Sequence, residues 1–204
     1  MAARREDIAG IILAGGGSTR MGHPKATLRW DGVTFIESEL RALQSAGLAP
    51  LVVVCGIHAD ETRSALPTGL EVEVHENPDP DRGQLSSLKI ALRALAPHDT
   101  RTAALVTLVD HPAVKLATLE ALCDAALPDR IVVPRFEGRR GHPVVFGREI
   151  FDELLATPDE SGARPVVRAD PNRVVEVETD DAGVLVDIDT PEDLARARQR
   201  EPRR

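Results

Sequence analysis

The stretch Ile11–Lys25 reads IILAGGGSTRMGHPK and runs from an apolar segment through three consecutive glycines into a basic loop. The apolar run Ile8–Leu13 predicts a buried strand, because continuous apolar residues are typical of a parallel strand covered on both faces. The glycines predict a turn that lets backbone N–H groups approach a ligand closely. Arg20 and Lys25 follow at a spacing that lets both cations reach one bound group. Backbone donors and two cations together indicate a polyphosphate site.

Two common phosphate-binding loops do not account for this stretch. Gly17 and Gly22 have the separation found in a Walker loop, but His and Pro follow where Lys and Ser or Thr are required. Counted from Gly15, the third glycine of the dinucleotide fingerprint is replaced by Arg20. The remaining alternatives are a distinct polyphosphate clamp and an ordinary glycine-rich turn with surface charges.

Short apolar runs alternate with helical patterns along the rest of the chain. This alternation predicts an α/β fold with three layers (α/β/α) and a Rossmann-like, mostly parallel sheet. We expect one domain over residues 1–200 and a polar tail at 201–204. Asp31-Gly32 predicts a hairpin turn. Strands are predicted at Ile8–Leu13, Pro50–Cys55, Val72–His75, Ala103–Val109, Ile131–Pro134, Val174–Glu178 and Val184–Ile188, and helices around Phe35–Leu43, Leu85–Leu95, Thr118–Leu127 and Thr190–Arg198.

Composition excludes several classes of protein. The 204 residues carry a net charge of −8, which argues against general nucleic-acid binding. No apolar run reaches 18 residues, so we expect no membrane span, and the glycines after Ala14 interrupt any signal peptide. Cys55 and Cys123 lie in apolar surroundings and predict buried thiols in a reducing, cytoplasmic location.

Five segments together carry a resemblance to a known family. LAGGGSTRMGHPK resembles the signature loop of the MobA-like nucleotidyltransferases, which include molybdenum cofactor enzymes and sugar-nucleotide pyrophosphorylases. HENPDPDRGQLSSLKIAL, LVDHPAV, GRRGHPVVF and VDIDTPEDL follow in the family's order, and the likeness covers nearly the whole chain. RGHP and DIDTPEDL resemble most the cytidylyl-transferring branch. The resemblance implies the nucleotide-diphospho-sugar transferase fold. It also implies a Mg²⁺-dependent enzyme that joins CMP from CTP to the phosphate of a molybdopterin cofactor and releases pyrophosphate.

The reaction defines what the loop must do. An acceptor phosphate is already a nucleophile, so the protein has to position two anions and neutralise their repulsion. The resemblance implies that Lys25 is held over the α-phosphate and that Lys25, Arg20 and Asp110 form the catalytic group. The expected contacts to nucleotide and acceptor are Leu13, Ala14, Gly15, Gly16, Gly17, Arg20, Lys25, Asn77, Ser86 and His142.

Magnesium requires oxygen ligands. Asp110 follows a predicted buried strand, so its carboxylate should emerge at the carboxyl edge of the sheet, where ligands bind in open α/β folds. The family's metal-binding segment matches LVDHP. Asp187 and Asp189 alternate along a predicted strand, so only one should face the metal, and Asp189 is preferred. Either of these two aspartates could instead cap the last helix.

The remaining polar candidates approach the two substrates. Asn77 offers donors and acceptors for a base or ribose. Ser86 and Ser87 stand where a helix begins, where they could bind an anion or cap the helix. His142 forms a basic cluster with two preceding arginines, and the resemblance implies that this cluster faces a phosphorylated pterin. A solvated turn is the alternative.

Several alternatives stay open at this level. Residues 14–16 read Ala-Gly-Gly, as in guanylyl-transferring members, where cytidylyl-transferring members often read Ala-Ala-Gly. CTP is therefore predicted and GTP is the alternative nucleotide. The acceptor could also be a sugar phosphate, or the chain could be a non-catalytic nucleotide sensor. A molybdoenzyme or a maturation protein is a further expected partner, and neither nucleic acid nor a membrane is expected.

Overall fold

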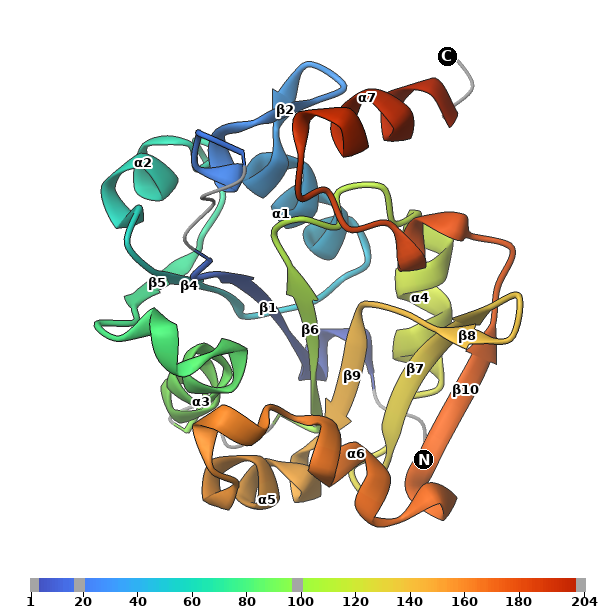
Figure 1. Cartoon of the computed structure of the whole chain (residues 1–204). Coiled ribbons are helices and arrows are strands. Elements are labelled where there is room, and N and C mark those ends of the chain that lie inside the picture. Colours follow the sequence, from blue (N-terminus) through green and yellow to red (C-terminus); the bar gives the residue numbers. More distant parts are fainter. Residues whose placement is uncertain (1–3, 17–20, 97–100, 201–204) are drawn as a thin grey trace.

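A computed structural model describes residues 4–16, 21–96 and 101–200, and its centre is a twisted sheet (Figure 1). Among these residues, seven strands lie in the order β10-β7-β9-β6-β1-β4-β5, and an eighth, β8, pairs with β7. The strands are β1 (Ile8–Ala14), β4 (Leu51–Cys55), β5 (Glu73–Glu76), β6 (Ala103–Leu108), β7 (Ile131–Phe136), β8 (Arg139–Arg140), β9 (Val144–Gly147) and β10 (Val174–Glu178).

The sheet is mostly parallel, as predicted. β1 pairs in parallel with both β4 and β6, and β4 with β5, so the carboxyl ends of these strands meet at one edge. β9 is inserted antiparallel between β6 and β7, whereas β10 runs parallel to β7. This shared edge at β1 and β6 is where the glycine turn and Asp110 come together.

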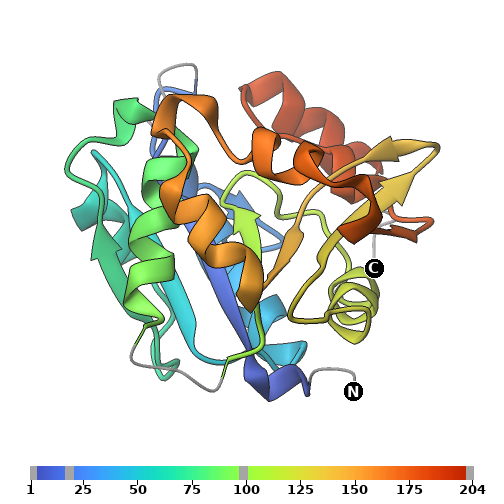
Figure 2. The same ribbon diagram turned by 90° about the horizontal axis from the view of Figure 1, so that it is seen from below.

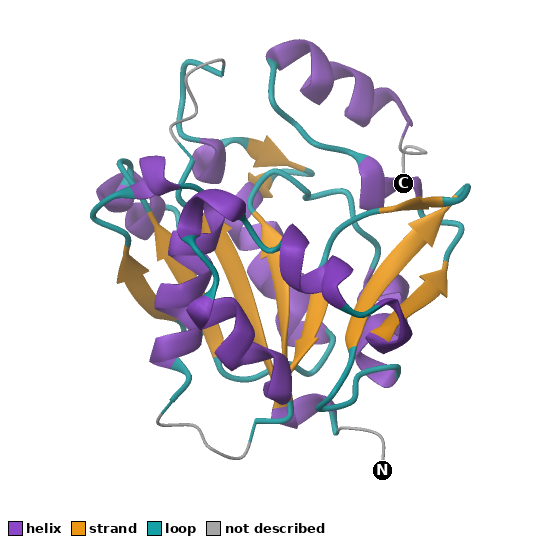
Figure 3. Ribbon diagram, turned by 60° about the horizontal axis from the view of Figure 1, so that its bottom comes forward, coloured by secondary structure: helices purple, strands orange, loops and turns teal. Residues whose placement is uncertain are grey.

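Helices cover both faces of the sheet, which gives the predicted three layers (Figures 2 and 3). One apolar cluster joins one face to α3, α5 and α6, and another joins the opposite face to α1 and α4. In the described parts, no helix is both long and apolar enough to cross a membrane. The helices are α1 (Phe35–Ser45), α2 (Ala59–Ser64), α3 (Gln84–Ala94), α4 (Leu116–Asp124), α5 (Phe151–Ala156), α6 (Arg164–Ala169) and α7 (Pro191–Arg200), with short 3-10 turns η1 (Arg5–Asp7), η2 (Lys25–Thr27), η3 (Pro80–Arg82), η4 (Arg148–Ile150), η5 (Asp159–Ser161), η6 (Pro171–Arg173) and η7 (Ala182–Leu185).

Local sequence signals explain several boundaries. The Thr34 side chain accepts a hydrogen bond from the Glu37 backbone N–H at 3.2 Å, which caps α1. Thr190 caps α7 in the same way, through the Asp193 N–H at 3.2 Å, as predicted. The predicted Asp31-Gly32 turn joins two short strands, β2 (Arg29–Trp30) and β3 (Val33–Thr34), into a hairpin. The predicted burial of Cys55 and Cys123 is also confirmed.

The strand predicted at Val184–Ile188 is wrong. Residues Ala182–Leu185 form the turn η7, and the chain then continues without pairing into a sheet. The buried Asp181 carboxylate stabilises this alternative, because it accepts hydrogen bonds from the Gly183 N–H, the Lys115 N–H and the Thr118 hydroxyl. Val184 and Ile188 are buried without strand pairing, and Leu185 and Val186 are half-buried. Strands β8 and β9 were not predicted.

Candidate active site

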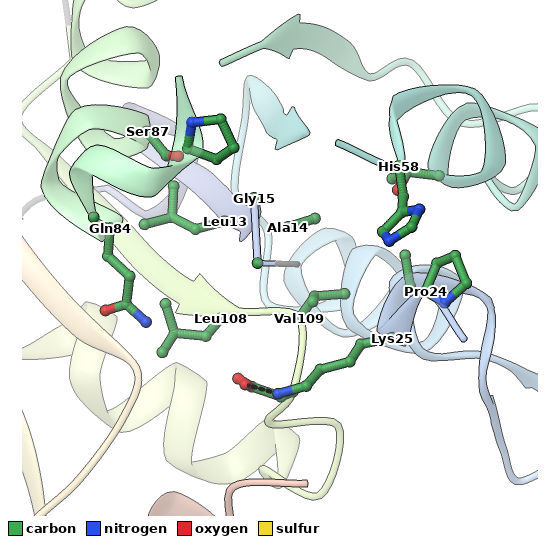
Figure 4. A pocket seen from close by; sticks show the side chains of 16 residues that line it. Leu13, Ala14, Gly15, Pro24, Lys25, His58, Gln84, Ser87, Leu108 and Val109 are labelled. Atoms are coloured by element: carbon green, nitrogen blue, oxygen red, sulfur yellow. Dashed lines mark hydrogen bonds and ion pairs between the residues drawn. The ribbon is translucent and has the colours of Figure 1, made fainter. Parts of the chain in front are cut away.

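A cavity of about 190 Å³ opens at the carboxyl ends of β1 and β6 (Figure 4). The glycine turn forms one wall, and Lys25 and Gln84 enter from opposite sides. Six of the residues predicted for the site line it: Leu13, Ala14, Gly15, Gly16, Lys25 and Asp110. Gly17 and Arg20, which were also predicted, lie outside the described residues. The other lining residues are Pro24, Ala26, His58, Thr62, Pro80, Gly83, Gln84, Ser87, Leu108 and Val109.

Lys25 connects two carboxylates that are far apart in the sequence. Its Nζ atom lies 2.7 Å from Asp110 Oδ2 and also contacts Asp189 Oδ1. The Lys25 and Asp110 side chains are only 14% and 19% exposed. Because both carboxylates touch one nitrogen atom, they are close enough to hold one small cation between them. The structure thus brings together three residues that were assigned to catalysis and metal binding.

This cluster keeps Lys25 charged. Burial alone lowers the pKa of Lys25, but the adjacent Asp110 and Asp189 carboxylates outweigh it, and the net pKa lies above the ordinary value. The ammonium group is therefore available at neutral pH to interact with an anionic ligand.

Asp187 has a different partner from Asp189. Its Oδ1 lies 2.6 Å from Nε2 of the buried His111, and this contact holds the pKa of Asp187 below its ordinary value. His111 Nε2 is in turn 3.8 Å from Asp110 Oδ1. The backbone N–H of Ile188 donates to the carbonyl of Asp110 at 3.0 Å. The segment that carries both aspartates is thus fixed against Asp110 without being a strand.

Asn77 and Ser86 lie behind the cavity wall. The Asn77 amide donates to the hydroxyls of Ser86 at 2.7 Å and Ser87 at 2.9 Å, and its side-chain carbonyl accepts from the Asp79 N–H. Ser87 lines the cavity, whereas Asn77 and Ser86 are buried and do not. This arrangement lets Asn77 fix the position of the Ser87 hydroxyl. Direct contact of Asn77 or Ser86 with a nucleoside stays a prediction.

His142 belongs to a second, larger cavity of about 830 Å³. Residues Leu13, Gly83, Gln84 and Leu108 line both cavities, so the two adjoin. Burial, followed by the effect of His111, lowers the pKa of His142 to about 4, so its imidazole is neutral at neutral pH. The rings of His111 and His142 lie 5.1 Å apart between their centroids. His142 thus connects the larger cavity to the carboxylate cluster.

Polar residues at or beside this site that were not predicted include His58 and Thr62 in the cavity lining and, behind it, Glu39 and His111. Glu39 is 6% exposed on the core face of α1, and burial, reinforced by Asp110, raises the pKa of its carboxyl well above the ordinary value. A signal for Glu39 exists in the sequence, because positions 36, 39, 40 and 43 share one helical face. The signal for His111 is its position directly after Asp110.

The residues present fit a divalent metal that is shared with a substrate. Asp110 Oδ1 is buried and has no hydrogen-bond partner within the described residues. Those residues contain no group of three His, Cys, Asp or Glu side chains that could hold a metal alone. Mg²⁺ is commonly bound by one or two carboxylates together with phosphate oxygens, so Asp110 and Asp189 suffice as its protein ligands.

Comparisons with known proteins agree with this geometry. Residues 10–175 match the MobA-like NTP transferase domain. The chain is 26% identical to molybdenum cofactor cytidylyltransferase of Escherichia coli over 93% of this chain and 95% of that protein. It is 29% identical to nicotine blue oxidoreductase of Paenarthrobacter nicotinovorans, with the same coverage of both chains.

A solved structure shows the same fold. Rv0371c of Mycobacterium tuberculosis superposes with a TM-score of 0.82 and 31% identity, over 95% of this chain and 99% of that chain. The same protein has been solved in complex with manganese, and this complex superposes with a TM-score of 0.77 and 30% identity over the same shares.

Proposed function

The chain belongs to the MobA-like NTP transferase family, and on that premise we propose that it transfers CMP from CTP to the phosphate of a molybdopterin cofactor. The observation that carries the proposal is the contact of Lys25 with Asp110 and Asp189 beside the glycine turn. A transferase of this kind needs one group that neutralises the α-phosphate and carboxylates that hold a metal.

The two cavities support a division between the substrates. The smaller cavity carries the glycine turn and Lys25, which suits the triphosphate. The larger cavity has an apolar floor from the sheet, including Val106, Val133 and Phe146, and an arginine rim that includes Arg164 and Arg168. Such a surface suits a flat heterocycle that carries an anionic group. With the substrates divided in this way, the shared wall would bring the acceptor phosphate next to the α-phosphate.

The chemistry follows from this arrangement. An oxygen of the acceptor phosphate attacks the α-phosphorus in line, and the bond from that phosphorus to the bridging oxygen of the β-phosphate breaks. Pyrophosphate leaves with the electron pair of that bond. Lys25 neutralises charge on the α-phosphoryl oxygens during the attack. Neutral His142 adds no charge to the acceptor side and offers one donor and one acceptor there.

Magnesium is part of the proposal. Asp110 and Asp189 would hold it, and the metal would neutralise charge on the triphosphate. The manganese complex of Rv0371c supports a divalent cation on this scaffold.

The experiment that tests this function is mass spectrometry of the products formed from CTP or GTP with metal-loaded molybdopterin. The expected product is the cytosine dinucleotide form of the cofactor, together with pyrophosphate. A guanine dinucleotide would overturn the cytidylyl assignment. Turnover only with sugar phosphates would overturn the assignment of the acceptor. If none of the tested acceptors gives pyrophosphate release, both the nucleotide and the acceptor assignments are contradicted.

Gly15 is predicted to influence the choice of base. An added Cβ at position 15 would lie 2.9 Å from the Ser87 hydroxyl oxygen, which Asn77 holds in place. Gly15→Ala therefore has to shift Ser87 at the cavity wall, and it restores the Ala-Ala-Gly pattern of cytidylyl-transferring members. We expect the ratio of kcat/KM for CTP over GTP to rise by roughly 10-fold, since one methyl group is worth about 1–3 kcal/mol of discrimination.

The matched control is Gly16→Ala. Among the described residues beyond its chain neighbours, a Cβ at position 16 meets no heavy atom within 4 Å, so this variant adds the same methyl group to the same turn without moving Ser87. Both ratios are measured with one acceptor. If Gly15→Ala leaves the ratio unchanged, or if Gly16→Ala changes it equally, position 15 does not read the base.

A further inference from the structure

Glu39 is an unusual residue for the place it occupies. Its neighbours on the core face of α1 are Phe35, Ile36, Leu40 and Leu43, all buried. Both of its carboxyl oxygens are buried, and among the described residues the polar groups that face them are the Thr107 hydroxyl and the His111 backbone N–H, neither of which forms a hydrogen bond of full geometry with them. A buried polar group without a partner costs free energy of folding, and an apolar side chain of similar size would avoid that cost. The position therefore requires an explanation other than core packing.

A small cavity lies next to Glu39. Its volume is about 50 Å³, and Thr107 of β6 and His111 line it together with Glu39. His111 Nδ1 is buried and has no hydrogen-bond partner in the described parts of the chain. A volume of this size has room for a water molecule, and three polar side chains around it supply the two to four partners that a buried water needs.

His111 extends this polar path toward the reacting groups. Its other ring nitrogen, Nε2, lies 2.6 Å from Asp187 Oδ1, on the segment that also carries Asp189. The ring stands beside His142, which faces the larger cavity. The orientation of one imidazole therefore affects the carboxylate segment and the wall of the acceptor cavity together.

We propose that Glu39 is a positioning residue of this active site, which acts through the small cavity on His111 Nδ1 and thereby holds Asp187 and its segment against Asp110. A carboxyl that stays protonated, as burial favours here, supplies both a donor and an acceptor to a bridging water. A hydrogen bond to one imidazole nitrogen fixes the orientation of the ring. It also determines whether the other nitrogen acts as a donor or as an acceptor. The effect on catalysis rests on the proposed function, whereas the polar path itself does not.

The test compares Glu39→Leu with Glu39→Gln, because glutamine keeps a donor and an acceptor of the same length. The first measurement is NMR of the histidine ring nitrogens in the protein without substrates. We expect Glu39→Leu to shift the His111 signals while those of His75, on β5 at the far edge of the sheet, stay in place. Glu39→Gln should leave the His111 signals close to those of the wild type.

The second measurement is pyrophosphate release. Glu39→Leu should lower kcat by roughly 10- to 100-fold, the usual size of effects from residues that orient functional groups, with little change in KM for the nucleotide. Glu39→Gln should restore most of the rate. In a His111→Phe background, Glu39→Leu should have no further effect, because the residue through which Glu39 acts is gone. Glu149→Leu, at an exposed position, is the matched control.

Unchanged His111 signals in a folded Glu39→Leu protein would overturn the proposal. Additive effects of Glu39→Leu and His111→Phe on kcat would overturn it as well. If Glu39→Leu does not fold, Glu39→Met, which is also apolar but unbranched and of similar length, takes its place in both measurements, and unchanged His111 signals in that variant would overturn the proposal. The NMR arm uses no acceptor, so a failure of the proposed reaction is distinguishable from a failure of this inference.

Discussion

Replacing Asp110 by Asn is expected to lower kcat by about 10²–10⁴-fold, while nucleotide binding measured without magnesium changes little. The substitution keeps the size of the side chain and removes its charge, so the cavity wall stays in place. A metal is worth several kcal/mol of charge stabilisation in the transition state, and each 1.36 kcal/mol is a factor of ten in rate. Asp110 is placed for this role because its buried Oδ1 has no partner among the described residues and its Oδ2 meets Lys25.

The measurement is a series of turnover rates across magnesium concentrations for wild type and variant. Asp60→Asn is the control, because that carboxylate is 98% exposed on α2 and its removal changes the net charge equally. Rates near those of the wild type at every magnesium concentration would show that Asp110 is not a metal ligand. If high magnesium concentrations fully restore the turnover rate of the variant, Asp110 contributes to the affinity for magnesium alone.

Much of the fold could be predicted because its signals are local. The apolar run at Ile8–Leu13, the hairpin at Asp31-Gly32 and the N-cap at Thr190 each depend on residues within one element, and the structure has all three. β9 was missed because it is a four-residue strand directly after Pro143, and its pairing with β6 is a long-range contact. Val184–Ile188 was misassigned because buried apolar residues in an irregular segment have the same pattern as a strand.

The same distinction between local signals and long-range contacts applies to the candidate active site. Lys25, Asp110 and Asp189 were grouped from motifs, and the structure brings their charged atoms into contact. The sequence could not predict which of these polar residues line the cavity and which lie behind its wall. Nothing local shows that Asn77 lies behind Ser87 and donates a hydrogen bond to its hydroxyl. Glu39 was missed for another reason. A glutamate in an amphipathic helix is ordinarily solvent-exposed, and only the helical face that it shares with Ile36 and Leu43 indicates burial.

Lys25 is expected to matter more in the transition state than in binding. Lys25→Ala should lower kcat by about 10²–10³-fold, the range found when one group that stabilises developing charge is removed, and should raise KM for the nucleotide much less. The reason is that charge on the α-phosphoryl oxygens changes as the acceptor attacks, so the ammonium interacts more strongly then. A change in KM alone would make Lys25 a uniform binder and its catalytic role would be wrong.

The contacts of Lys25 add a second expected result, for a different substitution of the same residue. In the structure the ammonium lies against both Asp110 and Asp189, so a metal has to compete with it for these carboxylates. Lys25→Met, which keeps an unbranched side chain without the charge, should therefore bind Mn²⁺ more tightly than the wild type when no nucleotide is present. Calorimetric titration with Mn²⁺ measures this directly, and Lys25→Met combined with Asp110→Asn should lose the gain. Weaker Mn²⁺ binding by Lys25→Met would mean that the lysine organises the carboxylates for the metal instead of competing with it, because in that case its removal lets the two like charges move apart.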